Sequence, residues 1–288
     1  MTFVHRYHPI VRELRARRLA GEFGRWHLLH GSYLQDWMLS PTAGNWRVRA
    51  DAGGRSRAFA DIGSHWCDLV EFVSGERFDT LTASTSIAIP ERPAETAESF
   101  TAHADAAGPA PLAPVTTEDA AIVTLRTATG VSWDVVVSQV SAGRRNRLWF
   151  ELDGAAGSAV FDEENPETAW LGLPDGAWVV ARGAGSLAPD RQRLSYLPGG
   201  HAQGYQDCFK AFVADTYAAI AGDKPTGLPT LDDGLRSARI VDAVLASAAS
   251  GAWTPVTPVD RPSSAAGSGA TEGPKAYGSG RPGNSNSP

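Results

Sequence analysis

Five segments that favour β-strands follow one another in the middle of the chain, and no helical pattern separates them. They are rich in β-branched and aromatic residues and cover residues 80–89, 120–127, 131–140, 147–153 and 158–162. Thr129 with Gly130, and Asp153 with Gly154, supply tight turns between neighbouring segments. Because strands joined by short turns pair antiparallel, this stretch predicts a largely antiparallel sheet.

Helical patterns flank this run of strands on both sides. The predicted helices cover residues 9–20, 59–73, 204–221 and 231–249, and one further strand covers residues 25–33. Strands and helices are thus segregated along the chain rather than alternating. We therefore expect an α+β fold, with an open mixed, largely antiparallel β-sheet and helices packed on one face.

Two stretches carry no regular pattern. Residues 259–288 consist mostly of Gly, Ser and Pro and contain too little apolar surface to offset the entropy of ordering, which predicts a disordered tail. Residues 90–114 mix Pro, Ala and Gly between two strand-like regions and are expected to form a long surface loop. The domain prediction is therefore one α+β domain over residues 1–258, followed by the tail.

Charge and cysteine content exclude several classes of partner. The 26 basic and 32 acidic residues give a net charge of −6, which offers no electrostatic footprint for nucleic acid or an anionic membrane. With only Cys67 and Cys208, we expect neither a disulfide framework nor a metal site. No segment resembles a signal peptide or a membrane span, so a reducing cytoplasm is the expected location.

Asp61 and His65 stand four residues apart on the helix predicted over residues 59–73. At that spacing both side chains project from the same helical face. A carboxylate beside an imidazole suits a general acid or base that acts on a hydroxyl group. The spacing by itself favours a simpler interpretation, a solvated or core-edge pair.

The context of this pair resembles a known family signature. The stretch reads GGRSRAFADIGSHWCDLVEFVSG and is similar to the Gfo/Idh/MocA pattern, in which paired glycines lead into an Asp-x-Gly-x-His helix. The resemblance places the catalytic residues at Asp61 and His65, with Gly63 between them. Glycine inside a helix costs about 1 kcal/mol relative to alanine, so close approach of another group would account for it.

Further segments match the same family in the same order, from about Thr2 to Val256. They are HRYHP at residues 5–9, YLQDW at 33–37, NWR at 45–47, LPGGHAQGYQDCFKAF at 197–212 and the closing helix at 228–253. The resemblance implies that the substrate is bound by Tyr33, Gln35, Trp46, Arg47 and His201. It also implies that residues 2–7 form a strand.

These binding assignments compete with structural ones. Trp46 is as easily explained by core or lid packing, and Arg47 by a surface charge. His201 lies between glycine-rich turns, where a helix-entry contact is an equal alternative. Tyr33 and Gln35 alternate with Leu34, so they share one face of a strand and form a plausible pocket wall.

The family implies an NAD(P) cofactor, yet the sequence shows no place for it. Members bind the dinucleotide on an N-terminal Rossmann domain, and its strand–GxGxxG–helix unit is not found. The only spacing match is Gly278, Gly280 and Gly283, which lies in the predicted tail without flanking strand or helix. The Glu-Lys-Pro motif of the catalytic lysine is absent too. A start site placed too late, a split enzyme and a degenerate domain are the open explanations.

We therefore hypothesise an oxidoreductase of this family: the substrate-binding and proton-transfer half of an NAD(P)-dependent sugar or cyclitol dehydrogenase. His65 would be the acid or base and Asp61 would orient it, and the chain by itself would be inactive. Its partners would be a sugar or polyol and either a homo-oligomer or a chain that supplies a Rossmann domain. A noncatalytic sugar-binding or oligomerisation subunit that docks on a full-length relative is the main alternative. An isomerase or lyase that uses the same residues is a weaker one.

Overall fold

The computed structural model describes residues 2–93, 111–183 and 188–259. The predicted tail, apart from Val259, and most of the predicted surface loop lie outside the described residues. The described ends of that loop pair with each other as a two-stranded ribbon of β3 (Glu91–Pro93) and β4 (Leu112–Pro114). Among the described helices, none combines the length and the apolar character needed to cross a bilayer.

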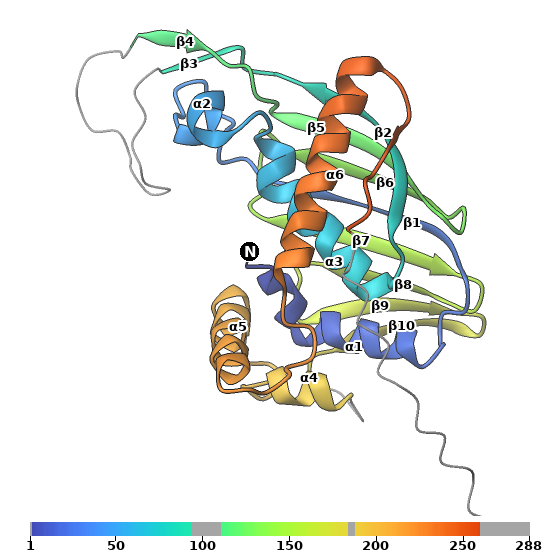
Figure 1. Cartoon of the computed structure of the whole chain (residues 1–288). Coiled ribbons are helices and arrows are strands. Elements are labelled where there is room, and N and C mark those ends of the chain that lie inside the picture. The colour runs from blue at the N-terminus through green and yellow to red at the C-terminus, as the bar shows by residue number, and fades with distance from the viewer. Residues whose placement is uncertain (1, 94–110, 184–187, 260–288) are drawn as a thin grey trace, which may run out of the picture.

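Within the described residues the fold is built on a nine-stranded sheet in the order β10-β9-β8-β7-β1-β6-β5-β2-β11 (Figure 1). The strands are β1 (Trp26–Leu34), β2 (Phe78–Ser86), β5 (Ala120–Thr127), β6 (Ser132–Ser138), β7 (Arg147–Gly154), β8 (Ser158–Asp162), β9 (Thr168–Leu173), β10 (Gly176–Ala181) and β11 (Thr254–Pro255). Only the β1–β6 pair is parallel, and every other pair in this sheet is antiparallel. The predicted open, mixed and largely antiparallel sheet is confirmed.

Helices cover one face of this sheet. Figure 1 shows α3 (Ser64–Ser74) and α6 (Leu231–Ser250) crossing in front of the strands, with α1 (Pro9–Leu19) below them. Two further helices, α4 (Pro189–Leu194) and α5 (Tyr205–Ile220), lie beyond the edge of α1 (Figure 1). The short helix α2 (Ala50–Gly53) follows the 3-10 turn η2 (Trp46–Val48). Helices on one face were also predicted, and none of the described helices covers the opposite face of the sheet.

The alternation of the central strands explains this one-sided packing. Residues of β6 alternate between exposed and buried, with Trp133, Val135 and Val137 facing the helices. Trp66 of α3 meets the edge of Trp133 and donates its indole N–H to the carbonyl of Trp149 at 2.8 Å. A Cβ on Gly31 would lie 2.2 Å from that carbonyl oxygen and 2.7 Å from the indole nitrogen, so only glycine fits there.

Several elements were not predicted. Strands β9 and β10 form a hairpin at the end of the sheet, and β10 is almost entirely exposed, so the hydrophobic alternation that reveals a strand is missing. The helix α4 and the two-residue β11 are too short to show a pattern. The family resemblance implied a strand over residues 2–7, and for most of this segment that prediction is wrong. Val4–Tyr7 form a 3-10 turn, η1, which contacts α5 and α3.

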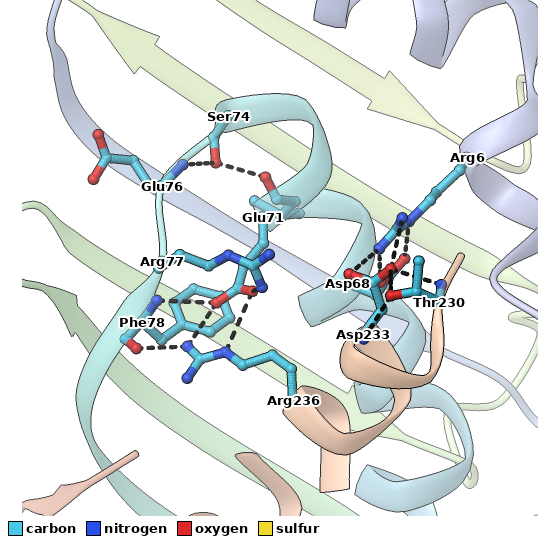
Figure 2. Close-up of polar contacts among 11 residues, drawn as sticks. Arg6, Asp68, Glu71, Ser74, Glu76, Arg77, Phe78, Thr230, Asp233 and Arg236 are labelled. Atoms are coloured by element: carbon cyan, nitrogen blue, oxygen red, sulfur yellow. Dashed lines mark hydrogen bonds and ion pairs between the residues drawn. The ribbon is translucent and has the colours of Figure 1, made fainter. Parts of the chain in front are cut away.

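A buried ion-pair network ties α6 to α3 and to η1 (Figure 2). The guanidinium of Arg6 donates two hydrogen bonds to the carboxylate of Asp68, and its Nη2 lies 3.3 Å from Asp233 Oδ1. Three residues after Asp68 on α3, Glu71 accepts hydrogen bonds from Arg236 at 2.8 Å and from Arg77 at 2.6 Å. The chain's first turn and its last helix are thereby fixed to the same helix of the core.

Candidate functional site

The helix that carries the predicted catalytic pair begins with an irregular turn. Phe59–Gly63 form a π-helical turn, η3, and the regular helix α3 starts only at Ser64. A Cβ on Gly63 would lie 2.6 Å from the ring of Phe59, which is the close approach that the glycine predicted. Because a π-turn holds more residues than an α-turn, Asp61 and His65 are offset rather than stacked one above the other.

A cleft of about 350 Å³ opens beside this turn on the helix-covered side of the sheet. It is lined by His5, Tyr33, Gln35, Trp37, Asp61, Ile62, His65, Asn146 and Tyr205. Four residues that the sequence analysis selected therefore meet in one place: Asp61, His65, Tyr33 and Gln35. Asp61 comes from η3 and His65 from α3. Tyr33 lies near the end of β1, and Gln35 directly follows that strand.

His65 is a neutral imidazole at the floor of the cleft. Burial, with a smaller contribution from the neighbouring His5, lowers its pKa to about 3. Its ring meets the edges of the Phe3 and His5 rings at centroid distances of 5.6 Å and 5.4 Å. Its Nδ1 atom is buried and has no hydrogen-bond partner within the described part of the chain. A neutral imidazole with unused hydrogen-bonding capacity is able to accept a proton.

Asp61 contacts other groups than the sequence analysis expected. Its Oδ2 accepts a hydrogen bond from Gln139 Nε2 at 2.8 Å, and its Oδ1 lies 3.4 Å from Arg47 Nε. Burial raises the pKa of this carboxyl, against the opposing effects of Arg47 and Gln139. No hydrogen bond joins it to His65 among the described contacts. In this structure Asp61 therefore forms a polar wall with Arg47 and Gln139.

An imidazole–carboxylate pair does exist at the edge of the cleft, between His5, which lines it, and Glu163 behind it. His5 Nδ1 lies 3.6 Å from Glu163 Oε1, and both side chains are less than a tenth exposed. Although burial opposes it, His5 holds the pKa of Glu163 below its usual range. The other carboxylate oxygen of Glu163 is buried without a partner in the described residues. The ring of His5 also contacts Tyr33 and Tyr205.

Amide and hydroxyl groups form the opposite wall. Tyr33 donates its hydroxyl to Asn146 Oδ1 at 2.8 Å, and Gln35 Nε2 donates to the same oxygen at 2.8 Å. Trp37 Nε1 in turn donates to Gln35 Oε1 at 2.9 Å. Burial raises the pKa of Tyr33, so this residue stays a neutral phenol. The wall is therefore uncharged and pre-organised by its own hydrogen bonds.

Three predicted binding residues do not line the cleft. Arg47 reaches it only through Asp61, and its guanidinium stacks on the ring of Trp46 at 4.5 Å. Trp46 itself is 39% exposed. His201 lies exposed in the loop before α5, and its carbonyl oxygen accepts a hydrogen bond from Arg182. Their roles in binding stay predictions.

Sequence reasoning missed His5, Glu163, Asn146 and Tyr205 as site residues. His5 and Tyr205 lie inside the segments that carried the family resemblance, so a closer look at their polar residues would have found them. Glu163 and Asn146 stand just outside the strands β8 and β7 and give no local signal. They enter the site because the sheet brings those strand ends beside η1 and β1.

The arrangement suits a neutral molecule with many hydroxyl groups. It offers hydrogen-bonding side chains, aromatic rings at Trp37 and Tyr205, and one buried neutral imidazole. The described residues contain no strand, glycine-rich loop and helix in the order that cradles a dinucleotide. They therefore do not fit the pyrophosphate of NAD(P), and no redox step is assigned to them.

Comparison with known proteins agrees with this fold. The profile of the GFO/IDH/MocA C-terminal domain matches residues 11–160. Levoglucosan dehydrogenase from Pseudarthrobacter phenanthrenivorans is 29% identical over 262 residues, which are 89% of this chain and 66% of that enzyme. The chain thus spans slightly less than two thirds of the length of this relative.

Solved structures give the same result. Levoglucosan dehydrogenase in complex with NADH and L-sorbose superposes with a TM-score of 0.77 at 29% identity, over 89% of this chain and 65% of that one. An oxidoreductase domain protein from Kribbella flavida gives a TM-score of 0.77 at 28% identity, over 89% and 66%. An inositol dehydrogenase homologue from Azotobacter vinelandii in complex with NAD+ has a TM-score of 0.72 at 21% identity over 88% and 64%, which supports the fold alone. The chain therefore belongs to the GFO/IDH/MocA C-terminal domain family, a family of oxidoreductase domains with sugar dehydrogenases among its relatives.

Proposed function

We propose that this chain binds the substrate and transfers the proton in NAD(P)-dependent oxidation or reduction of a hydroxyl group on a sugar, anhydrosugar or cyclitol. The observation that carries the proposal is the neutral His65 on the floor of a cleft lined by hydrogen-bonding side chains. A relative is named levoglucosan dehydrogenase and was solved with L-sorbose and with levoglucosan, both polyhydroxylated. A cleft of about 350 Å³ is large enough for a monosaccharide.

His65 acts as the general base in this proposal. At neutral pH its imidazole is uncharged, because burial lowers its pKa to about 3, and it accepts the proton that a substrate hydroxyl loses during oxidation. Transfer in the opposite direction serves reduction. Positive charge on the ring is unfavourable in this buried place, which makes the proton easy to return.

The walls orient the substrate. Asn146, Gln35 and Tyr33 offer amide and phenol groups to hydroxyls on one side. On the other side Asp61, positioned by Arg47, offers its carboxylate. His5, steadied by Glu163, borders the same space and hydrogen-bonds a second hydroxyl. NAD(P) is the electron carrier that the solved relatives suggest, and it would be held by residues other than those described here.

Sugar binding by the chain tests this proposal without the need for a cofactor. Saturation-transfer NMR with levoglucosan, glucose and myo-inositol should detect binding that Gln35→Ala and Asn146→Ala weaken about tenfold each, since each removes one or two hydrogen bonds. His27→Ala removes an exposed histidine of β1 outside the cleft and should bind like the wild type. The proposal fails if none of these molecules binds, or if the cleft variants bind as well as His27→Ala.

A noncatalytic docking subunit is the second candidate. The face of the sheet that the helices leave open carries apolar side chains, among them Ile122 at 59% and Val179 at 67% exposed. Exposed apolar surface of this kind suits association with another chain. Activity of the complex with a cofactor-binding partner separates the two functions, because His65→Gln would abolish it under the first and leave it unchanged under the second.

A further inference from the structure

Three side chains of types that bind metals meet on the open face of the sheet, the face opposite to the helices and the cleft. His30 lies on β1, and Glu151 and Asp153 lie on the neighbouring strand β7. His30 is the direct antiparallel partner of Glu151, and Asp153 follows two residues further along the same face. Between them, Leu29 and Leu152 point to the opposite side and are fully buried under the helices.

The ligand atoms are already close together. His30 Nε2 lies 3.7 Å from Glu151 Oε2 and 3.8 Å from Asp153 Oδ2, and the three atoms all fall within 4.8 Å of one another. Two ligands of a tetrahedral Zn²⁺ stand about 3.4 Å apart when each bond is about 2.1 Å long. A small rotation of side chains that are each about a third exposed is therefore enough to enclose an ion.

The charges on this cluster are unbalanced. Two carboxylates of one strand face a single imidazole. A divalent cation bound between them would compensate both negative charges. The ring edge of Trp149 packs against the imidazole at a centroid distance of 5.2 Å and limits its rotation. The site is thus partly pre-organised by the sheet.

We propose that His30, Glu151 and Asp153 form a binding site for a divalent transition-metal ion, with Zn²⁺ as the ion that their geometry suits. One nitrogen and two oxygen ligands are a borderline-to-hard set, which accepts Zn²⁺, Co²⁺ or Mn²⁺ and does not favour Cu⁺. Three protein ligands leave at least one position for water or for a group from another molecule. Because the ligands come from two strands far apart in the sequence, a search for metal motifs does not find them.

Metal titration of the full chain tests this site. After treatment with a chelator, isothermal titration with Zn²⁺ at pH 7.5 should show one saturable site, and Co²⁺ should develop the visible absorption of a low-coordinate ion. His30→Ala and Asp153→Asn should each weaken binding at least about tenfold, since two ligands remain. The matched control His27→Ala, an exposed histidine on the same strand, should bind like the wild type.

A second readout guards against misfolded variants and against binding elsewhere. Zn²⁺ should raise the Tm of the wild type and of His27→Ala but not that of His30→Ala, whose own Tm without metal should match the wild type. Absence of saturable binding up to about 1 mM Zn²⁺ overturns the proposal and leaves a simple ion pair between His30 and the carboxylates. Equal binding by His30→Ala and His27→Ala overturns it as well, because the metal would then sit at other residues.

Discussion

Two parts of the helix α3 carry buried polar side chains, and they are built in contrasting ways. Asp68 pairs with the guanidinium of Arg6, and one turn later Glu71 pairs with that of Arg236 (Figure 2). At the start of the helix, His65 has a buried ring nitrogen without a partner in the described structure. The difference indicates which side chains stabilise the fold and which are available to react with a ligand.

Satisfied and unsatisfied polar groups have different physical consequences. A buried carboxylate with a bidentate guanidinium partner is fixed in place, and the pair holds the elements that carry it. A buried polar atom without a protein partner costs stability, and beside a cleft it is available to a ligand or to a reaction. We therefore expect the Arg6–Asp68 pair to serve the structure, and the proposed function places the chemistry at His65.

The largest effect is expected on catalysis. His65→Gln keeps a polar side chain of similar size but no group that takes up a proton near neutral pH, so turnover should fall about 10²- to 10⁴-fold. The measurement is dehydrogenase activity of the chain assayed together with its NAD(P)-binding domain or partner. The free energy of unfolding at pH 7.5 should change by no more than about 1 kcal/mol. A loss of stability that matches the loss of activity would contradict the comparison.

The second effect concerns the network. Arg6→Met leaves Asp68 buried without its bidentate partner, and we expect the free energy of unfolding to fall by about 3 kcal/mol, as measured by urea denaturation. Arg55→Met breaks the exposed pair with Asp242 and should leave stability unchanged. If the free energy of unfolding fell by the same small amount in both variants, the buried ion pairs would not stabilise the fold as their geometry indicates.

The third effect is on the pH dependence of stability, to which His65 contributes. The unfolded chain protonates its histidines near pH 6.5, whereas the fold keeps His65 neutral down to about pH 3 and His8 down to about pH 4. The unfolded state thus binds more protons in this window, and stability falls as the pH falls. Between pH 6.5 and 5 each histidine accounts for up to about 2 kcal/mol.

His65→Gln isolates this contribution. Urea denaturation of the variant at both pH values should show a decrease in unfolding free energy that is smaller than the wild-type decrease by up to about 2 kcal/mol. An exposed control, His27→Gln, should keep the full wild-type decrease. Identical pH dependence in wild type and His65→Gln would mean that the imidazole is not held neutral by the fold.

The smallest effect is expected at Asp61. Its side chain is 25% exposed and bound to Gln139 and Arg47, so Asp61→Asn should lower the unfolding free energy by less than about 1 kcal/mol. Because Arg47 loses its anchor at the edge of the cleft, the KM for the sugar should rise several-fold while kcat changes less. A fall in kcat comparable to that of His65→Gln would instead place Asp61 in the proton transfer itself.

Local patterns in the sequence were enough for much of this protein. Five strand-like segments without intervening helices determined the antiparallel sheet, because strands joined by tight turns have only one way to pair. The spacing of Asp61 and His65, together with the motif around them, located one wall of the cleft. Local patterns did not predict the elements that lack a periodic signal, such as the exposed strand β10 and the turn η1.

The partnerships between side chains were decided by the tertiary structure alone. Asp61 turns to Arg47 and Gln139 because the π-turn offsets it from His65, and the carboxylate of the cleft pair comes from Glu163 at the end of β8. Likewise, His30 meets Glu151 only through the register of β1 against β7. A sequence reveals which segments are helical or extended, since that depends on neighbours along the chain. Contacts between distant segments depend on strand order and register, which only the packed sheet defines.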